Sequence, residues 1–274
     1  MTQPTLADAI AALGGIAPLR YAGSWDNVGL LVQGADLRAP LGRALLTIDL
    51  NRRVLEEALE HGAQLVIAYH PVIFKGHKRL TDAHPEQSVL LDLIRAGISV
   101  YSPHTALDAA PGGVCDWLID GLGALASRAP VEEVRDLAPE LAGTVGAGRV
   151  GELVEPVSLD VLVERLKVHL GLPQVRVAAA AAHADGAPIR RLAVCPGAGG
   201  SLFEKLRGPE LFVTGEMRHH DVLARVARGE SVILTDHTNT ERGYLAVLAE
   251  RLGAALAGAD FVVSERDRDP LVIR

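Results

Sequence analysis

The strongest constraint on the fold is a repeated alternation between short apolar strands and helical segments along the 274-residue chain. Runs of aliphatic and β-branched residues predict strands at 44–48, 65–69 and 98–102. Helices are predicted between them, at 51–61 and 89–96. This β-α-β-α order is typical of an α/β fold with a mostly parallel sheet that helices cover on both faces.

A second alternating series begins near residue 158. It predicts helices at 159–170, 201–206, 218–227 and 241–252, and strands at 175–179, 192–195, 211–214, 232–235 and 261–264. Between the two series, 122–155 is rich in Ala, Gly, Pro and Glu and shows weak periodicity. We expect part of this segment to be a junction between two α/β halves.

Composition excludes several classes of protein. Hydrophobic residues make up 49% of the chain, which indicates a globular protein rather than a disordered one. The formal net charge of −7 argues against nucleic acid as a partner. Cys115 and Cys195 form no closely spaced pair, so we expect structural thiols and no disulfide framework. Residues 1–13 lack the pattern of a signal peptide or membrane span, which favours the cytoplasm.

Three polar clusters directly follow predicted strands. They are Tyr69-His70-Pro71, the segment from His104 to Asp108, and the segment from Asp236 to Glu241. In open α/β sheets, ligands bind beyond the carboxyl ends of the strands. We therefore expect residues that are far apart in the sequence to meet at one sheet edge.

The residue types in these clusters are those that bind divalent metals. His104 and Asp108 are four residues apart, as are His237 and Glu241, so each pair would share one face of a helix. With His70 they supply five polar groups, enough for two metals that activate one water. Any one of these histidines alone is more often a capping or hydrogen-bonded residue, and Glu241 can instead stabilise a helix N-terminus.

At these residues the chain resembles the NIF-three-like proteins (NGG-one-interacting factor 3-like), often described as GTP cyclohydrolase 1 type 2 homologs. The matching segments appear in the family's order and span nearly the whole chain: 24–32, 70–74, 104–108, 197–201, 214–216 and 236–243. The resemblance implies two interlocking α/β domains with mostly parallel or mixed sheets. We expect one domain at 1–124 together with 230–274, and the other at 125–229.

The resemblance also implies a two-metal site that faces the cavity of a homohexameric ring. Carried over by motif, the metal ligands are His70, Asp108, His237 and Glu241. The family has two histidines before the proline, and here the first is Tyr69, whose phenol is a poorer ligand. We therefore expect one or two divalent ions per chain, with Zn, Fe, Mn and Ni all compatible. Tyr69 and His104 are expected beside the ligands, where His104 would orient a ligand or a water.

Other polar or aromatic residues have two interpretations each. Glu216 and one of the adjacent histidines, His219 or His220, are candidates to move a proton near the metal, with His220 chosen here and Glu216 alternatively orienting a ligand. The glycine-rich segment 197–201 is interpreted as a tight turn rather than a phosphate cradle, and Trp25 as core packing rather than substrate stacking. The basic run 75–79 is a solvated loop, or attracts an anionic substrate.

The leading hypothesis for function is a metal-dependent hydrolase that acts on a nucleotide-like or other small phosphorylated substrate. The main alternative is a non-catalytic metal-binding ring that binds a protein partner or handles metal. A third hypothesis, nucleic-acid binding in the cavity of the ring, is disfavoured by the acidic balance of the chain.

Overall fold

The computed structural model describes residues 3–271 and divides into two compact α/β units. Unit 1 consists of Met1–Leu107 and Tyr244–Arg274, and unit 2 of Asp108–Gly243. Each unit contains a mixed sheet and helices, which confirms the predicted α/β fold class. Among the described residues, no helix is long and apolar enough to cross a membrane.

The sheet of unit 1 has five strands and is parallel except at one edge. Its order is β1 (Gly29–Val32), β4 (Ser99–Ser102), β3 (Leu65–Ala68), β2 (Arg43–Thr47) and β13 (Asp260–Val263). Only β1 runs antiparallel to its neighbour, β4. All four residues of β3 are buried, which explains why its sequence is a continuous apolar run.

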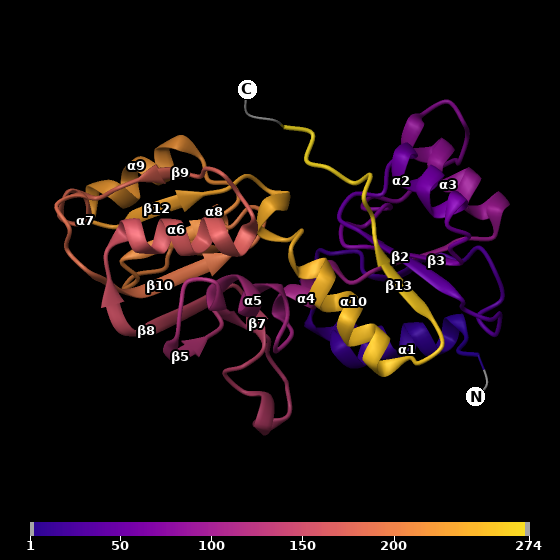
Figure 1. The fold of residues 1–274 in the computed structure, drawn as a ribbon, viewed down its shortest axis with the longest axis horizontal. Helices are drawn as coiled ribbons and strands as arrows, with labels where there is room; N and C mark the ends of the chain where they lie inside the picture. The colour runs from indigo at the N-terminus through magenta and orange to yellow at the C-terminus, as the bar shows by residue number, and fades with distance from the viewer. Residues whose placement is uncertain (1–2, 272–274) are drawn as a thin grey trace. The chain divides into compact units, whose positions relative to one another are not determined.

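Helices cover both faces of this sheet. Figure 1 shows α2 (Arg52–Glu60) and α3 (Pro85–Ala96) on one face, and α1 (Leu6–Ile16) and α10 (Tyr244–Ala255) on the other. A short 3-10 turn, η1 (Leu19–Tyr21), follows α1. Side chains of β2, β3 and β4 pack with those of α2 and α3 in one core cluster, including Leu45, Val66, Val100, Leu55 and Leu93. The carboxyl ends of the parallel strands are thus held rigidly by a packed core.

The sheet of unit 2 has six strands and a parallel centre. Its order is β5 (Leu125–Ala129), β8 (Arg149–Val157), β10 (Ile189–Cys195), β11 (Leu211–Thr214), β12 (Ser231–Leu234) and β9 (Arg176–Ala178). The pairs β10–β11 and β11–β12 are parallel, and the other pairs are antiparallel. The carboxyl ends of these central strands therefore lie at one edge, which is where the candidate site is built.

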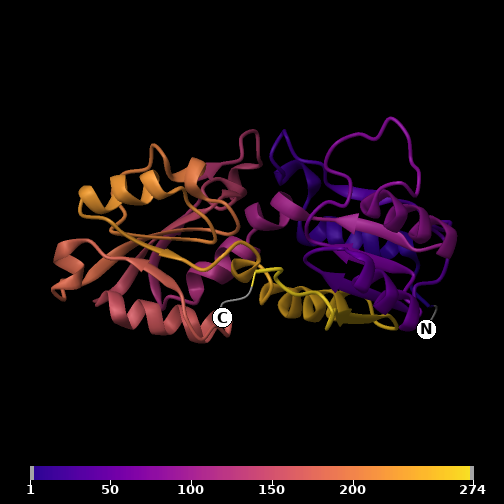
Figure 2. The same cartoon turned by 90° about the horizontal axis from the view of Figure 1, so that it is seen from above.

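The two faces of this sheet carry separate cores. Figure 2 shows α6 (Leu159–Leu170) and α9 (His219–Ala227) on opposite sides of the strands. Val213 and Ile233 pack in one core cluster, with α6 and α5 (Val114–Asp120). Phe212 and Val232 pack in the other, with α9 and α8 (Gly200–Phe203). Alternate residues of each strand thus serve alternate faces. The remaining elements are α4 (His104–Ala109), α7 (Ala181–Ala184), β6 (Glu132–Glu133), β7 (Gly146–Ala147), η2 (Pro139–Leu141) and η3 (Thr238–Thr240).

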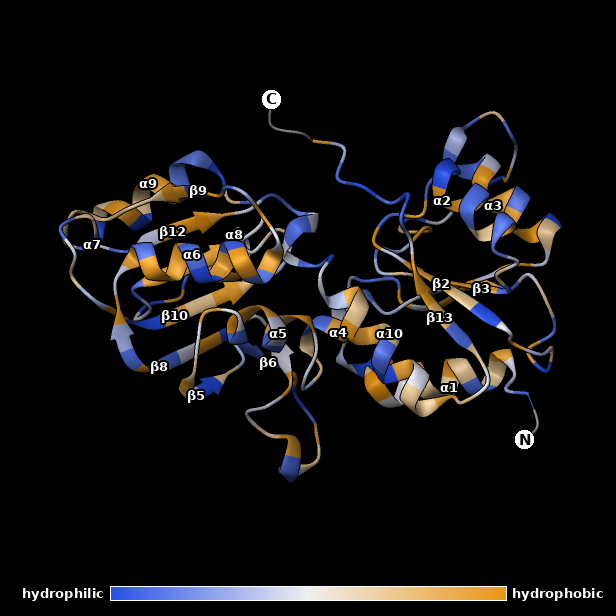
Figure 3. Cartoon of the chain, viewed as in Figure 1, coloured by the Kyte–Doolittle hydropathy of each residue, from blue (hydrophilic) through white to orange (hydrophobic). Residues whose placement is uncertain are grey.

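The segment 122–155, expected to be partly a junction, contains two strands of the larger sheet. β8 is nine residues long and pairs with both β5 and β10. Figure 3 shows β12 as mostly apolar, whereas β8 mixes polar and apolar residues, so the periodicity of β8 is weak. The compact units also differ from the expected domains. Residues 108–124 and 230–243 belong to unit 2 and not to unit 1. The reason is that α5 packs in the core of unit 2, and β12 pairs with β11 and β9.

Candidate metal centre

In unit 1, three polar side chains follow neighbouring parallel strands. Asp49 comes after β2, His70 after β3, and His104 after β4. The imidazole ring centroids of His70 and His104 are 5.5 Å apart, at an interplanar angle of 79°. The strand-end rule therefore brings together residues from three separate parts of the sequence.

His70 is oriented by a carboxylate that the sequence analysis did not identify. Its Nδ1 lies 2.9 Å from Oδ1 of Asp49. Because a carboxylate only accepts, this bond places the ring proton on Nδ1, and Nε2 then carries the lone pair that a metal requires. Metal-binding histidines commonly have this arrangement. Asp49 follows β2 as His70 follows β3, so the same strand-end rule would have found it.

His104 is tied to a buried carboxylate. Its Nδ1 lies 2.8 Å from Oδ1 of Asp26, whose side chain is fully buried, and Thr105 donates to Asp26 through its amide and its hydroxyl. Burial alone would raise the pKa of Asp26, but hydrogen bonds from His104, Thr105 and the Asn27 amide hold it below its ordinary value. His104 also has φ 31°, in the left-handed region that residues with side chains rarely adopt. Asp26 thus braces the start of α4.

Tyr69 lies beside both histidines. Its side chain is 2% exposed, and its ring centroid is 5.1 Å from that of His70 and 5.6 Å from that of His104. The ring meets His104 edge-on, at 85°. A buried phenol at this position packs against the two imidazoles and limits how they can rotate.

In unit 2, His237 lies between two carboxylates. Its Nδ1 is 3.1 Å from Oε2 of Glu216, and its Nε2 is 3.6 Å from Oε1 of Glu241. Glu241 is buried, whereas the side chain of Glu216 is 53% exposed. Glu216 therefore orients the imidazole, and Nε2 and Glu241 present two donor atoms side by side.

The local backbone differs from the expected helix. α10 begins at Tyr244 and not at Glu241, so His237 and Glu241 do not share a face of an α-helix. They flank the 3-10 turn η3 instead. The hydroxyl of Thr240 donates to the carbonyl of His237 and accepts from the amide of Gly197, which holds the turn against the segment after β10.

Gly197 leaves space next to the two donor atoms. A Cβ at this position would lie 2.8 Å from Oε1 of Glu241 and 2.9 Å from Nε2 of His237. Its φ of 59° also favours glycine. The amides of Gly197 and Gly199 already bond to the hydroxyls of Thr240 and Thr214. These bonds support the interpretation of 197–201 as a tight turn, and α8 after it is only four residues long.

Asp108 lies on α4 and is half-buried. Together with burial, which is the larger cause, its charge raises the pKa of the Cys115 and Cys195 thiols, so all three groups are neighbours. Glu241 adds to the same effect on Cys195. Both cysteines are free. Asp108 and Glu241 thus share one neighbouring residue, Cys195.

The remaining predicted residues lie further out. His220 is exposed on α9, with its ring 5.6 Å from that of His219. Trp25 was expected in the core, and this expectation was wrong, since 66% of it is exposed. Asp26, the next residue, is bonded to His104 and Thr105, and the indole of Trp25 lies against the rings of His104 and Phe74 at the surface.

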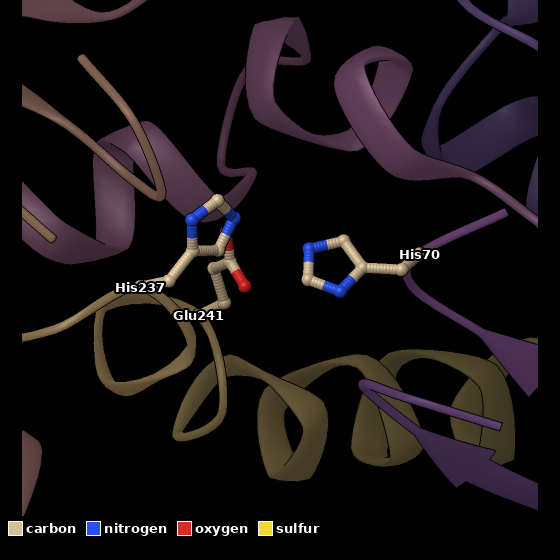
Figure 4. Close-up of side chains that lie close together, drawn as sticks. All are labelled: His70, His237 and Glu241. Carbon is tan, nitrogen blue, oxygen red and sulfur yellow. The ribbon is translucent and has the colours of Figure 1, made fainter. Parts of the chain in front are cut away.

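Figure 4 labels three of the four predicted ligands: His237 and Glu241, which lie side by side in unit 2, and His70, which belongs to unit 1. Imidazole and carboxylate donors suit Zn, Fe, Mn and Ni. In unit 2, the Nδ1 bond of His237 to Glu216 and the space beside Gly197 fit a metal on the Nε2 side of that ring. In unit 1, the Nδ1 bond of His70 to Asp49 likewise leaves its Nε2 for a metal.

The chain is similar to known proteins along nearly its whole length. A family model described as Duf34/NIF3 (NGG1p interacting factor 3) matches residues 4–270. The chain belongs to the Duf34/NIF3 family. This membership confirms the resemblance that the motifs carried.

Relatives in the Duf34/NIF3 family match along nearly the whole chain. The Protein NIF3 homolog of Schizosaccharomyces pombe is 41% identical over 262 residues, covering 92% of each chain. NGG1-interacting factor 3 of Saccharomyces cerevisiae is 38% identical and covers all of this chain and 98% of the yeast protein. The crystal structure of a Bacillus cereus protein related to NIF3 covers both chains fully with a TM-score of 0.83 at 19% identity, which shows a shared fold.

Proposed function

We propose that the chain is a divalent-metal-dependent hydrolase for a nucleotide-like or other small phosphorylated substrate. The ligands in this proposal are His70, Asp108, His237 and Glu241, with one or two ions per chain. The observation that carries it is the His237–Glu241 pair, whose nitrogen and oxygen donors lie 3.6 Å apart beside the space at Gly197. Three histidines whose Nδ1 atoms are fixed by carboxylates give further support.

Each neighbouring side chain has a role in this proposal. A bound divalent ion supplies positive charge that acidifies water and stabilises negative charge on the substrate. Glu216, half-exposed and bonded to His237, both orients that ring and accepts a proton. His220 is the second candidate proton carrier, from the exposed face of α9. His104 and Tyr69 hold the ring of His70 in place.

Two parts of the proposal come from the family resemblance alone. One is the homohexameric ring, and the other is the activity of a GTP cyclohydrolase 1 type 2 homolog. The proposed substrate class is broader than this activity, because the residues themselves indicate only divalent-metal chemistry. A cytoplasmic location is also part of the proposal, and it rests on the pattern of residues 1–13 instead of on the resemblance.

A second candidate function is a metal-binding ring that binds a protein partner or handles metal without catalysis. The name of the yeast relative, NGG1-interacting factor 3, supports it, because that name describes a protein that interacts with another protein. This candidate predicts tight metal binding with no turnover of any nucleotide, phosphate ester or cyclic amide in a broad panel.

The test is to measure metal content and turnover together in the full-length protein and in His237→Ala. The hydrolase proposal expects this substitution to abolish both. His61→Ala, which removes an exposed histidine of α2's C-terminus, is the matched control and should change neither. Turnover that persists after complete metal removal would contradict the proposal.

A further inference from the structure

Two large aromatic side chains of unit 1 are exposed next to each other. Trp25 is 66% exposed and Phe74 is 50% exposed, and their ring centroids are 6.1 Å apart at an interplanar angle of 58°. Only 4% of the chain is aromatic, so most of the few rings available would be expected to stabilise the cores. A pair of rings left open to solvent in such a chain indicates a binding surface.

The backbone holds these two rings in place before any ligand arrives. The indole of Trp25 lies over Gly23, where a Cβ would come within 2.8 Å of its Nε1. The side-chain amide of Asn27 donates to the carbonyl of Ile73, the residue before Phe74. The turn of Trp25 and the segment of Phe74 are thus joined directly, which lowers the entropy cost of ordering them on a ligand.

The exposed pair lies close to His104, which contacts the proposed metal ligand His70. The indole meets the ring of His104 edge-on, with centroids 6.2 Å apart, and His104 lies 5.5 Å from His70. A planar ring stacked on Trp25 would therefore lie close to His104, which contacts His70. Both features belong to unit 1, so this arrangement does not depend on any other part of the chain.

The charge beside the pair suits an anionic ligand. Lys75, Lys78 and Arg79 directly follow Phe74 in the sequence and are exposed. They form a local cationic segment on a chain whose formal net charge is −7. An apolar ring carrying a phosphate complements both the aromatic pair and this segment.

We propose that Trp25 and Phe74 are a stacking site for the base of a nucleotide, with its phosphate facing the segment 75–79. This inference rests on the proposed function and defines its substrate as a nucleotide rather than a simple phosphate ester. Because stacking uses the face of the ring, the site accepts more than one base.

The test is equilibrium binding of adenosine monophosphate, guanosine monophosphate and ribose 5-phosphate to full-length, metal-free protein by calorimetry. Both nucleotides should bind at least tenfold more tightly than ribose 5-phosphate. Trp25→Leu should weaken nucleotide binding about tenfold, as expected for loss of one stacked base, and Trp25→Phe should weaken it less. In a Trp117→Phe background, Trp25 is the only tryptophan, and its fluorescence should be quenched by the nucleotides.

Leu223→Ala is the matched control, since it removes another exposed apolar side chain, on α9, and should leave the affinity unchanged. Equal affinity in Trp25→Leu and the unsubstituted protein would overturn the inference, as would equal affinity for nucleotides and ribose 5-phosphate. If Trp25→Leu instead dissociates the oligomer with nucleotide affinity unchanged, the surface is a contact between copies, and the inference is also overturned.

The two proposals fail in different ways. Nucleotide binding through Trp25 without turnover in metal-loaded protein would contradict the hydrolase and leave the stacking site standing. Turnover with an unchanged KM in Trp25→Leu would contradict the stacking site and leave the hydrolase standing.

Discussion

His104 and His237 are each bound through Nδ1 to a carboxylate, yet the two carboxylates lie in opposite environments. The side chain of Asp26 is fully buried and accepts hydrogen bonds from His104, from Thr105 and from the amide of Asn27. The side chain of Glu216 is 53% exposed and contacts His237 across 3.1 Å. The His104–Asp26 contact is therefore a rigid part of unit 1, whereas the exposed His237–Glu216 contact in unit 2 can adjust.

The burial of each carboxylate determines whether its bond to histidine contributes to stability or to chemistry. A buried carboxylate with several donors contributes to folding, because its loss leaves those donors without a partner. An exposed carboxylate contributes little to folding, so its pairing with His237 has consequences mainly for what that imidazole binds.

The largest expected effect is on stability, in Asp26→Ala. We expect a loss of about 3 kcal/mol in the free energy of unfolding, measured by urea denaturation at pH 7, because the donors of His104 and Thr105 lose their acceptor. Glu216→Ala is the comparison and should cost less than about 0.5 kcal/mol. Equal losses in the two variants would show that burial does not distinguish the pairs.

The same comparison has a pH dependence with a defined sign. The pKa of Asp26 is lower in the folded chain than its ordinary value of 3.8, so its contribution is fully present well above pH 3.8. That contribution is lost as the pH falls through the folded-state pKa. The stability difference between Asp26→Ala and the unsubstituted protein should therefore shrink only below pH 3.8.

The second expected effect is on metal affinity, in Glu216→Gln. The amide cannot hold the imidazole of His237 as the carboxylate does, so we expect metal affinity to fall between about 10-fold and 100-fold with little change in stability. Competition with a chromogenic chelator measures the affinity. Glu204→Gln removes an exposed carboxylate of the same unit as a control, and a similar loss there would indicate a general charge effect.

A third and smaller effect separates backbone strain from crowding at the metal. Gly197→Ala places a methyl group within 3 Å of Oε1 of Glu241 and Nε2 of His237, so metal affinity should fall about tenfold. Gly171→Ala has a similar φ of 67° with no atom within 4 Å of the added Cβ. Both variants should lose about 1 kcal/mol of stability, and only Gly197→Ala should lose metal. Equal metal affinity in the two would mean that the space at Gly197 has no role.

The smallest expected effect is the lack of reaction at two cysteines. Burial raises the pKa of both Cys115 and Cys195, so the thiolate is scarce in the folded chain. Iodoacetamide at pH 8 should label neither residue in native protein and both in 8 M urea, by mass spectrometry. Rapid native labelling of Cys195 would show that the neighbourhood of Asp108 and Glu241 is open.

Much of the fold followed from the sequence, because strands buried on both faces leave a clear apolar run. β3 and β11 were predicted to within one residue, and α6 at both ends. β8 was missed because its residues face different environments and include Glu152, Glu155 and Pro156. Pairing with β5 and β10, and not local propensity, makes that segment a strand.

The candidate site was predicted unevenly for a related reason. Residues that follow apolar strands, such as His70 and His237, were identified by position and motif. Asp49 obeys the same rule but lies in no motif, and its part became apparent only from the bond to His70. The exposure of Trp25 depends on how one turn packs against Phe74 and His104, which spacing along the chain does not report.

The proposed function depends on His237 and Glu241 binding a divalent metal. Elemental analysis of the purified, full-length protein tests it most directly, with His237→Ala and His61→Ala prepared in parallel. We expect at least one divalent ion per chain in the unsubstituted protein and in His61→Ala, and none in His237→Ala. A metal-free unsubstituted protein that does not take up Zn, Fe, Mn or Ni on addition, or an equal metal content in His237→Ala, would contradict it.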